Sequence, residues 1–509
     1  MTIDYSSVSI PAQTQAAAET VSSMIAVDTI ASHKMLVSSV VILLSLLILE
    51  QAVYRSKKGK LPGAQWKIPI VGKFFDSMNP TMENYQKQWD MGPLSVVSVF
   101  HMFIVMASSN EYTRKIFNSP QYAEPCLVNA APQIIEPDNW VFLNGKVHAD
   151  YRRGLNALFT RKAISIYLGV QDKIMRTHFA QWLANPNANH EDIMTKIRDF
   201  NMDTSLRVFC GEHIPAPAVK EITEQYWLIT LALELVNFPL ALPGTNVYNA
   251  IQSRKVAMKH LEEAAKQSKI YMAGGGEPTC LIDEWVKEMN PDGKTKNTFS
   301  DHEMAQVVFS FLFASQDAMS SGTIYLFQHL ADMPDILAKV RAEHDRVRPD
   351  ASRPLTLEDL DEMPYLRAVV KESMRVKPPV TMVPYKTTQP FPISPDYTIP
   401  AGCMVIPSIY PSTQDPEVYP QPEKLLPERW LDPNSPANQN PKNYLIFGSG
   451  PHRCIGQEYA LLVMSNTIVT AAATMDWDHK ITPDSEVVSI IATLFPKDGC
   501  LLKFRPRAA

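Results

Sequence analysis

The hydrophobic pattern begins with one long uncharged segment near the amino terminus. The run MLVSSVVILLSLLIL covers residues 35–49, and it extends to Tyr54 with Glu50 as its only charge. About 20 such residues are needed to cross the hydrocarbon core of a bilayer. Residues 1–34 carry three acidic side chains in place of the short basic leader of a cleaved signal peptide. The pattern therefore predicts a retained transmembrane anchor over residues 35–54.

Basic residues follow this segment directly and predict its orientation. Arg55, Lys57, Lys58 and Lys60 come after the anchor, and positive charge marks the cytosolic side of a membrane span. We therefore expect residues 1–34 to form a luminal tail. The basic, proline-containing stretch over residues 55–75 predicts a stiff hinge, and residues 76–509 predict one cytosolic catalytic domain.

Most of the chain after the hinge has helical periodicity, and its clearest helix begins at Ser300. Apolar residues recur at three- and four-residue spacing from about Glu111 to Met374. Ser300 and Glu303 form a capping box, and no proline follows until Pro334. The helix would have about 30 residues, or roughly 45 Å. It is apolar on nearly every face, so the pattern predicts that it crosses the interior.

Two local patterns leave alternatives open. Polar residues gather in the middle of the long helix, which indicates either a water-filled cavity or hydrogen bonds to the backbone or to neighbouring side chains; they are Ser315, Gln316, Asp317, Ser320 and Ser321. The segment LVNFPLALPG around Pro239 is apolar and broken by proline. It predicts either a membrane-dipping entry port or an ordinary buried loop.

Composition narrows the class of protein. The chain is 45% apolar and 20% charged, with a formal net charge of −5, which is ordinary for a globular protein and argues against a nucleic-acid partner. The chain has 40 prolines, and their clustering after residue 376 excludes one long helix there. Six cysteines without a Cys-x-x-Cys pair argue against a structural zinc site and a disulfide framework.

One cysteine stands in a setting that favours chemistry. In NYLIFGSGPHRCIG, Cys454 lies between a glycine-rich turn and an apolar run that predicts a helix starting at the cysteine. The N–H groups at a helix start lower the pKa of a thiol and favour the thiolate. A thiolate serves as a metal ligand or as a nucleophile. His452, two residues away, leaves both readings open.

The stretch FGSGPHRCIG resembles the haem-binding loop of the cytochrome P450 family, whose pattern is Phe-x-x-Gly-x-Arg-x-Cys-x-Gly. Phe447, Gly450, Cys454 and Gly456 match, and His452 stands at the arginine position. The resemblance implies a mainly α fold with small β-sheets, the cytochrome P450 fold, behind an N-terminal transmembrane helix. It implies haem b with Cys454 as the axial thiolate, and His452 as a donor to a propionate.

Further motifs stand in the order of that family. KESMR contains Glu372 and Arg375, and PERW supplies Arg429. The resemblance implies that these three residues form a buried network behind the haem. GKVHADYRRGL resembles the family's C-helix motif, which implies that His148 and Arg152 face the propionates, with Tyr385 or Lys386 as a further haem contact.

The long helix resembles the family's oxygen-binding helix. The usual small-Gly-x-acid-Thr motif becomes Ala314, Ser315, Gln316, Asp317 and Ala318. The acid is kept, while serine replaces glycine and alanine replaces threonine. The resemblance implies that Asp317 helps to deliver protons to bound O₂. Ala318 cannot do so in place of threonine, so either Ser315 or an ordered water substitutes for it, or the mechanism tolerates the loss.

Within the family, FLFASQDAMSSG, PPVTMVPY and FPKDG are similar to the fungal members that desaturate sterols. The expected reaction forms the double bond between C-22 and C-23 in the side chain of an ergosterol precursor. It would use O₂ and electrons from NADPH, delivered by NADPH–cytochrome P450 reductase, in a single-pass protein of the endoplasmic reticulum membrane. The expected substrate contacts, which core packing explains equally well, are Phe311, Ala314, Val380, Thr381, Met382, Val383, Leu494 and Phe495.

Other functions stay open on the sequence alone. Another sterol oxidation by the same chemistry, such as hydroxylation or 14α-demethylation, would need the same motifs. An O₂-independent haem-thiolate isomerase would use neither a reductase nor NADPH, and the retained Asp317 argues against it. A non-catalytic protein would bind haem and sterol without turnover.

Overall fold

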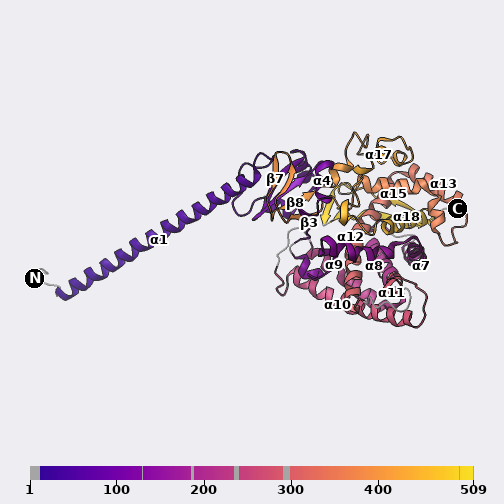
Figure 1. Cartoon of the computed structure of the whole chain (residues 1–509), viewed down its shortest axis with the longest axis horizontal. Helices are drawn as coiled ribbons and strands as arrows, with labels where there is room; N and C mark the ends of the chain where they lie inside the picture. Colours follow the sequence, from indigo (N-terminus) through magenta and orange to yellow (C-terminus); the bar gives the residue numbers. More distant parts are fainter. Residues whose placement is uncertain are drawn as a thin grey trace, which may run out of the picture.

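A long helix projects from a globular body in this computed structural model (Figure 1). The structure describes residues 12–128, 130–184, 189–233, 240–289, 299–491 and 493–507, with side chains from residue 34 onward. The projecting helix is α1, Ala12–Lys58, and its segment Lys34–Lys58 is long and apolar enough to cross a membrane. It ends at Lys58 and is followed by Gly59, whose positive φ of 55° suits glycine. The first residues of the predicted hinge are therefore helical.

A mixed sheet lies where α1 meets the body. Its strand order is β1-β2-β8-β5-β3, and β8 runs parallel to β2 while the other pairs are antiparallel. The β-branched residues of LSVVSV and MFIVMA favour the β1–β2 hairpin, which lies at one edge of the sheet. Tyr54 of α1 is buried against Phe103 of β2, with ring centroids 6.0 Å apart. The strands are β1 Leu94–Val99, β2 Met102–Ala107, β3 Ala123–Pro125, β5 Tyr385–Thr387 and β8 Met404–Pro407.

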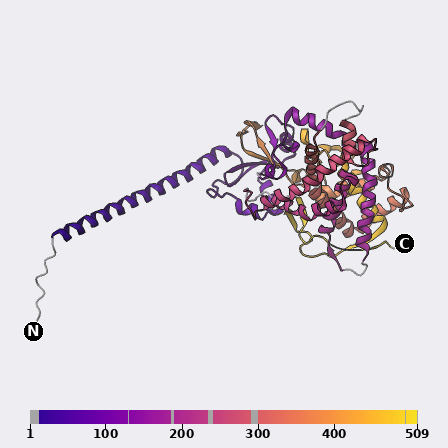
Figure 2. The ribbon, with the colours of Figure 1, turned by 90° about the horizontal axis from the view of Figure 1, so that it is seen from below.

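The predicted long helix is confirmed and forms the centre of the body. It is α12, Asp301–Asp332, and Ser300 with Glu303 makes the capping box that the sequence indicates. Helices α8 and α10 pack on one side of α12, and α13, α15 and α18 pack on the other (Figure 1); Figure 2 shows the helical body that they form, from below. Most of its side chains are buried because helices cover both sides.

The remaining elements complete this helical body and its edges. The helices are α2 Phe74–Met78, α3 Met82–Trp89, α4 Asn110–Phe117, α5 Ala131–Ile135, α6 Gly145–Asn156, α7 Arg161–Leu183, α8 Met194–Cys210, α9 Ala216–Ala232, α10 Asn246–Ala273, α11 Leu281–Met289, α13 Pro334–Val347, α14 Leu357–Asp361, α15 Pro364–Val376, α16 Tyr410–Thr413, α17 Pro436–Gln439 and α18 Gln457–Thr474. Small antiparallel sheets are made by β6 Phe391–Ser394 with β7 Tyr397–Ile399, by β10 Val488–Ile491 with β11 Thr493–Pro496, and by β4 Glu191–Asp192, β12 Leu501–Pro506 and β9 Met475–His479.

The polar centre of α12 divides between the two readings that the sequence left open. Ser320 Oγ donates to the Gln316 carbonyl at 2.6 Å and accepts from Asn201 Nδ2 at 2.9 Å. The Ser321 hydroxyl donates to the Leu494 carbonyl, and Gln316 Nε2 donates to a backbone oxygen of α8. These three side chains are therefore bonded within the core, whereas Ser315 lines a cavity.

The apolar segment around Pro239 falls largely outside the described residues, which omit 234–239. Just after the gap, Leu240 and Leu242 are about half exposed, at 53% and 54%. The choice between entry port and buried loop stays a prediction.

Candidate functional site

A cavity of about 440 Å³ separates the middle of α12 from the loop that carries Cys454. Apolar side chains supply most of its walls. Phe311, Ala314 and Ala318 come from α12, and Val380 and Val383 come from the segment after α15. The cavity therefore joins segments that lie far apart in the sequence around one thiol.

Tight backbone geometry holds Cys454 at the edge of this cavity. Its N–H donates to the Phe447 carbonyl at 2.9 Å. Gly450 has a φ of 72°, and a Cβ there would lie 2.2 Å from the Phe117 carbonyl oxygen, so only glycine fits. The next helix, α18, begins at Gln457 with Gly456 as its cap. The loop thus presents the thiol from just before the helix start.

The predicted lowering of the Cys454 pKa is wrong for the protein chain by itself. Burial raises the pKa of this thiol above its ordinary value, and the Gly456 N–H, Arg152 and Arg453 offset that effect only in part. The sulfur is accessible from the cavity, but protein surrounds it on most sides. Since a metal binds the deprotonated form, iron binding would displace the thiol proton.

Nitrogen donors gather beside the thiol. The rings of His148 and His452 stack with centroids 4.0 Å apart, and Trp140 lies parallel to His148 at 6.2 Å. Burial, together with repulsion from His148 and Arg152, lowers the pKa of His452 to about 4. Burial and, to a smaller extent, repulsion from the Arg152 charge also lower the pKa of His148. Both imidazoles are therefore neutral donors near pH 7 in the chain by itself.

The Arg152 side chain provides a test of whether this cavity fits haem. It donates to the Arg453 carbonyl, and no carboxylate among the described residues pairs with its guanidinium. A half-buried guanidinium without a carboxylate is an incomplete site, because buried charges are normally paired. The two propionates of haem would supply the missing anions beside Arg152, His148 and His452. The residues present therefore fit haem, and Cys454 would hold its iron.

The oxygen-binding segment of α12 is divided between two environments. Ser315 and Ala318 line the cavity, and Ser315 Oγ lies 3.3 Å from Ser205 Oγ. Asp317 points elsewhere: it forms an ion pair with Arg198 of α8 and accepts from Thr230 of α9 at 2.9 Å. Only 7% of Asp317 is exposed. Its expected part in proton delivery stays a prediction, and the structure does not bring its carboxylate to the cavity wall.

The expected substrate contacts also divide. Phe311, Ala314, Val380 and Val383 line the cavity, as does the expected haem contact Tyr385. The other four expected contacts are not among its lining residues; they are Thr381, Met382, Leu494 and Phe495. Backbone pairing and core packing account for them: Thr381 accepts from the Ile409 N–H, Met382 pairs with Ser408, Leu494 N–H donates to Pro379, and Phe495 is in the core.

Sequence reasoning missed several walls of the cavity. They come from segments without a recognisable motif; examples are Leu127, Phe142, Phe159, Phe209, Met374 and Tyr459. Each is an apolar or aromatic residue within a helical or loop pattern. No local signal separates such residues from core positions.

The expected buried network forms behind the cavity. Glu372 Oε1 accepts from Arg375 Nη2 and Arg429 Nε, both at 2.9 Å, and Oε2 accepts from Arg375 Nε at 2.9 Å. The sequence motifs did not include Trp430, whose Nε1 donates to Oε2 at 2.8 Å, or the Leu426 N–H, at 3.0 Å from Oε1. One carboxylate therefore accepts five hydrogen bonds and joins α15 to the PERW segment.

The site combines an accessible thiol, side chains that can donate to haem propionates, and a long helix over an apolar cavity. These features define a haem-thiolate enzyme. The Cytochrome P450 family model matches residues 62–490, so the chain belongs to the cytochrome P450 family. A solved structure titled "Retinoic acid bound cyanobacterial CYP120A1" matches with a TM-score of 0.76 and 23% identity, over 88% of this chain and 99% of that one. This match confirms the predicted fold. The family uses haem with a cysteine thiolate, O₂ and NADPH-derived electrons from a redox partner, and the enzyme is an oxidoreductase of that kind.

Curated relatives narrow the comparison within the family. The chain is 43% identical to the C-22 sterol desaturase erg5 of Aspergillus fumigatus, over 88% of this chain and 90% of that one. It is 42% identical to the C-22 sterol desaturase ERG5 of Saccharomyces cerevisiae, over 94% and 91%. A protein of Emericella variicolor named cytochrome P450 monooxygenase oblE is 43% identical over 91% and 92%.

Proposed function

We propose that the chain is a sterol C-22 desaturase, which forms the double bond between C-22 and C-23 in the side chain of an ergosterol precursor. Two curated relatives with that name are similar over nearly the whole chain. The observation that supports the proposal is the apolar cavity beside Cys454. Ala318 lines this cavity at the position where the family usually has threonine. A small side chain there leaves room for a sterol side chain close to the haem.

The cofactor supplies the oxidising chemistry, and the chain holds it in place. When bound, haem activates O₂ with two electrons from NADPH and removes hydrogen from unactivated C–H bonds. The sterol loses one hydrogen from each of two neighbouring carbons. One O₂, two electrons and two protons are consumed, and two waters leave. Cys454 would hold the iron, while Arg152, His148 and His452 would hold the propionates.

The apolar walls would position the substrate. Two hydrogens on adjacent carbons must face the haem in turn, so the side chain must be held in one orientation. Phe311 and Ala314 on α12, and Val380 and Val383 from the segment after α15, line the cavity and supply apolar contact. A flat, apolar sterol matches such walls better than a polar substrate.

The side chain at the cavity wall that can transfer a proton is the hydroxyl of Ser315, because the Asp317 carboxylate does not line the cavity. Ser315 Oγ is hydrogen-bonded to Ser205 Oγ at 3.3 Å and to the Leu312 carbonyl at 3.3 Å. It can donate a proton to oxygen in the cavity and recover one through a neighbouring hydroxyl or water. Asp317, paired with Arg198 and Thr230, could take part only if those bonds opened.

We place the enzyme in the endoplasmic reticulum membrane as a single-pass protein. The apolar segment Lys34–Lys58 of α1 would span the bilayer. The basic residues Arg55, Lys57, Lys58 and Lys60 favour the cytosol for the catalytic domain. That side is where NADPH–cytochrome P450 reductase would deliver its electrons.

Product analysis tests this proposal. Membranes that contain the chain and the reductase are incubated with NADPH and sterols that have a saturated C-22, and the products are analysed by mass spectrometry. The expected product is lighter than its substrate by two hydrogen atoms. A control without NADPH should give no product, which also excludes an isomerase.

A second candidate function rests on the monooxygenase relative of Emericella variicolor, whose identity equals that of the Aspergillus desaturase. Insertion of one oxygen atom would make the product heavier by that atom. An alcohol as the sole product would overturn the desaturase proposal while leaving the haem-thiolate site intact. Tight sterol binding without any product would favour a non-catalytic binding protein.

A further inference from the structure

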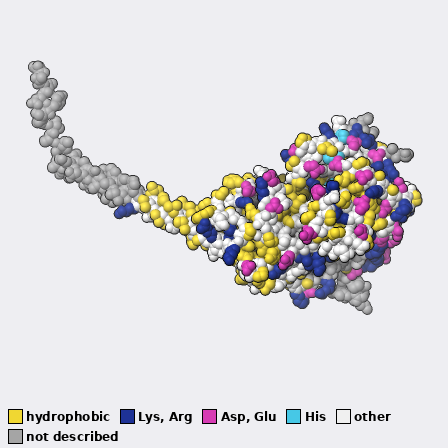
Figure 3. All heavy atoms as spheres, turned by 90° about the horizontal axis from the view of Figure 1, so that it is seen from above, with side chains coloured by type: hydrophobic (Ala, Val, Ile, Leu, Met, Phe, Trp, Pro, Cys, Tyr) yellow, Lys and Arg dark blue, Asp and Glu magenta, His cyan; other side chains and the backbone are white. Residues whose placement is uncertain are grey.

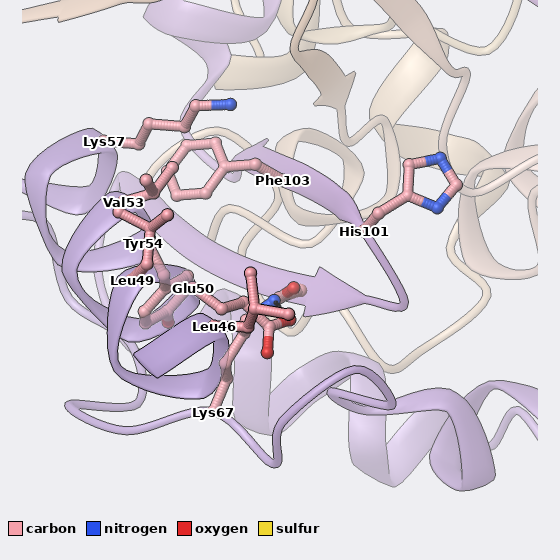
Figure 4. Close-up of a pocket in the computed structure, with 10 residues that line it drawn as sticks. Leu46, Leu49, Glu50, Val53, Tyr54, Lys57, Lys67, His101 and Phe103 are labelled. Atoms are coloured by element: carbon pink, nitrogen blue, oxygen red, sulfur yellow. Dashed lines mark ion pairs between the residues drawn. The ribbon is translucent and has the colours of Figure 1, made fainter. Parts of the chain in front are cut away.

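A second recess lies where α1 meets the sheet, and it shares no lining residue with the cavity at Cys454. Its volume is about 330 Å³. Leu46, Leu49 and Val53 of α1 form one wall, and Phe103 of β2 contributes to the other (Figure 4). The three α1 side chains are 57%, 59% and 46% exposed. The recess is therefore an open apolar notch beside the helix and not a part of the packed core.

Its polar residues carry an excess of positive charge. Lys67 Nζ lies 2.5 Å from Glu50 Oε1, so these two charges offset each other. Lys57 sits next to Phe103 (Figure 4), with its Nζ 5.9 Å from the ring centroid. No carboxylate in the described part of the chain forms an ion pair with Lys57. Its backbone is held in place, because Tyr397 Oη donates to the Lys57 carbonyl at 2.6 Å.

The position of the recess along α1 indicates its surroundings. About 20 helical residues cross the hydrocarbon core of a bilayer. Counted from Met35, that length ends near Tyr54. Leu46, Leu49 and Val53 then lie at the depth of the acyl chains, and Lys57 lies one turn further, at the depth of the headgroups.

The neighbouring surface fits the same depth. Trp66, Ile68, Ile70 and Phe75 are 65%, 61%, 62% and 68% exposed. Arg55 lies over the Trp66 ring, 3.7 Å from its centroid. Tryptophan is enriched at the boundary of lipid and water. Figure 3 shows hydrophobic side chains along α1 that continue onto the adjoining corner of the body.

We propose that this recess binds one anionic phospholipid of the surrounding leaflet, with its phosphate at Lys57 and an acyl chain against Leu46, Leu49 and Val53. The proposal rests on the membrane anchorage proposed above. The charge excess selects an anionic headgroup, and the apolar wall selects a lipid over a soluble phosphate. Because the recess is shared by α1 and the β1–β2 hairpin, a lipid bound there ties the anchor to the catalytic body and limits how the body tilts on the membrane.

The test uses the full-length, haem-loaded protein in nanodiscs that mix phosphatidylcholine with phosphatidylserine. Lipid that stays bound after mild release from the disc is identified by native mass spectrometry. We expect one retained phosphatidylserine per wild-type chain. Lys57→Gln should lower retention about five-fold, which corresponds to about 1 kcal/mol for one basic residue near a lipid surface. The matched control Lys60→Gln removes the same charge outside the recess and should change retention less than about two-fold.

A second pair of variants tests the apolar wall. Leu49 lines the recess, so Leu49→Gln places a polar group in its apolar wall. Ile48→Gln is the control, because Ile48 is 69% exposed and does not line the recess. Only Leu49→Gln should lower retention. Haem content and membrane insertion are measured for every variant, to show that each chain is folded and anchored.

Three results would overturn the proposal: equal retention of phosphatidylcholine, equal loss in Lys57→Gln and Lys60→Gln, or wild-type retention in both Lys57→Gln and Leu49→Gln. The first removes the charge selection, the second indicates diffuse attraction to a basic segment, and the third removes the site. Retention is measured without sterol or turnover, so each of these results leaves the desaturase proposal standing. A wild-type chain that does not insert into the discs would instead overturn the anchorage.

Discussion

Replacing Glu372 by glutamine should destabilise the protein far more than replacing an exposed glutamate. The Glu372 side chain is fully buried and accepts hydrogen bonds from Arg375, Arg429, Trp430 and the Leu426 backbone. Both guanidinium groups are buried as well, with 0% and 7% of their side chains exposed. Glutamine keeps the size of the side chain but leaves two cations without their carboxylate.

The magnitude follows from that burial. Removing one partner of a buried ion pair costs about 3–5 kcal/mol. Backbone carbonyls of Thr413 and Lys424 still accept from Arg375, which favours the lower half of that range. Since a folded domain is stable by only about 5–15 kcal/mol, we expect Glu372→Gln to lose a large share of its stability.

Urea unfolding of the detergent-solubilised holoprotein, followed by haem absorbance and tryptophan fluorescence, measures the change. Glu358→Gln is the control, because Glu358 pairs with Arg161 on the surface with 78% of its side chain exposed, and such pairs contribute about 0–1 kcal/mol. Arg429→Lys keeps the charge and should lie between the two, which matters if Glu372→Gln yields no folded protein. Equal midpoints for Glu372→Gln and Glu358→Gln would refute the reasoning.

Three further outcomes follow from the site and its surroundings. Cys454→Ser should abolish the red-shifted Soret band of the reduced carbon-monoxide complex, which reports thiolate ligation; an unchanged band would mean that another residue binds iron. Ala318→Thr adds a branched hydroxyl side chain at the cavity wall and should weaken sterol binding or shift the product from alkene toward alcohol, whereas wild-type values of both would remove Ala318 from the substrate site. Burial alone would raise the pKa of Asp283, but hydrogen bonds from His213, Ser268 and Thr279 hold it at about 2, below its ordinary value of 3.8. The ionised Asp283 therefore contributes roughly 2 kcal/mol to the free energy of unfolding. This contribution is present above about pH 4 and is lost as the pH falls toward 2. In acid unfolding, wild type should lose more stability than Asp283→Asn between these two pH values.

Sequence reasoning predicted those parts of the site whose geometry is set by neighbouring residues. The Cys454 loop depends on glycines at fixed spacing, because a side chain at Gly450 would meet the Phe117 carbonyl. The start of α12 depends on Ser300 and Glu303, three residues apart. Local constraints of this kind are visible in the order of residues alone, and the fold class followed from them through the family resemblance.

The effect of burial on the pKa of Cys454 could not be predicted from the neighbouring sequence. A helix start lowers the pKa of an exposed thiol, and the sequence indicated such a start at Cys454. Protein surrounds that sulfur on most sides, so burial outweighs the backbone and the nearby arginines, and the pKa is raised. How many atoms enclose a group depends on segments elsewhere in the chain, and the sequence near the group does not contain that information.

The surroundings of the oxygen-binding segment of α12 also depend on segments that are distant in the sequence. A helix turns 100° per residue, so Ser315, Asp317 and Ala318 cannot all face one cavity equally. Ser315 and Ala318 are three residues apart and share a face, and both line the cavity. Asp317 is rotated away toward α8 and α9, where Arg198 and Thr230 meet it. Those partners lie more than 80 residues away in sequence, so the motif by itself cannot reveal that they hold the acid. We therefore propose that proton delivery begins at the Ser315 hydroxyl, or at water beside it, and that Asp317 takes part only if the bonds from α8 and α9 open during turnover.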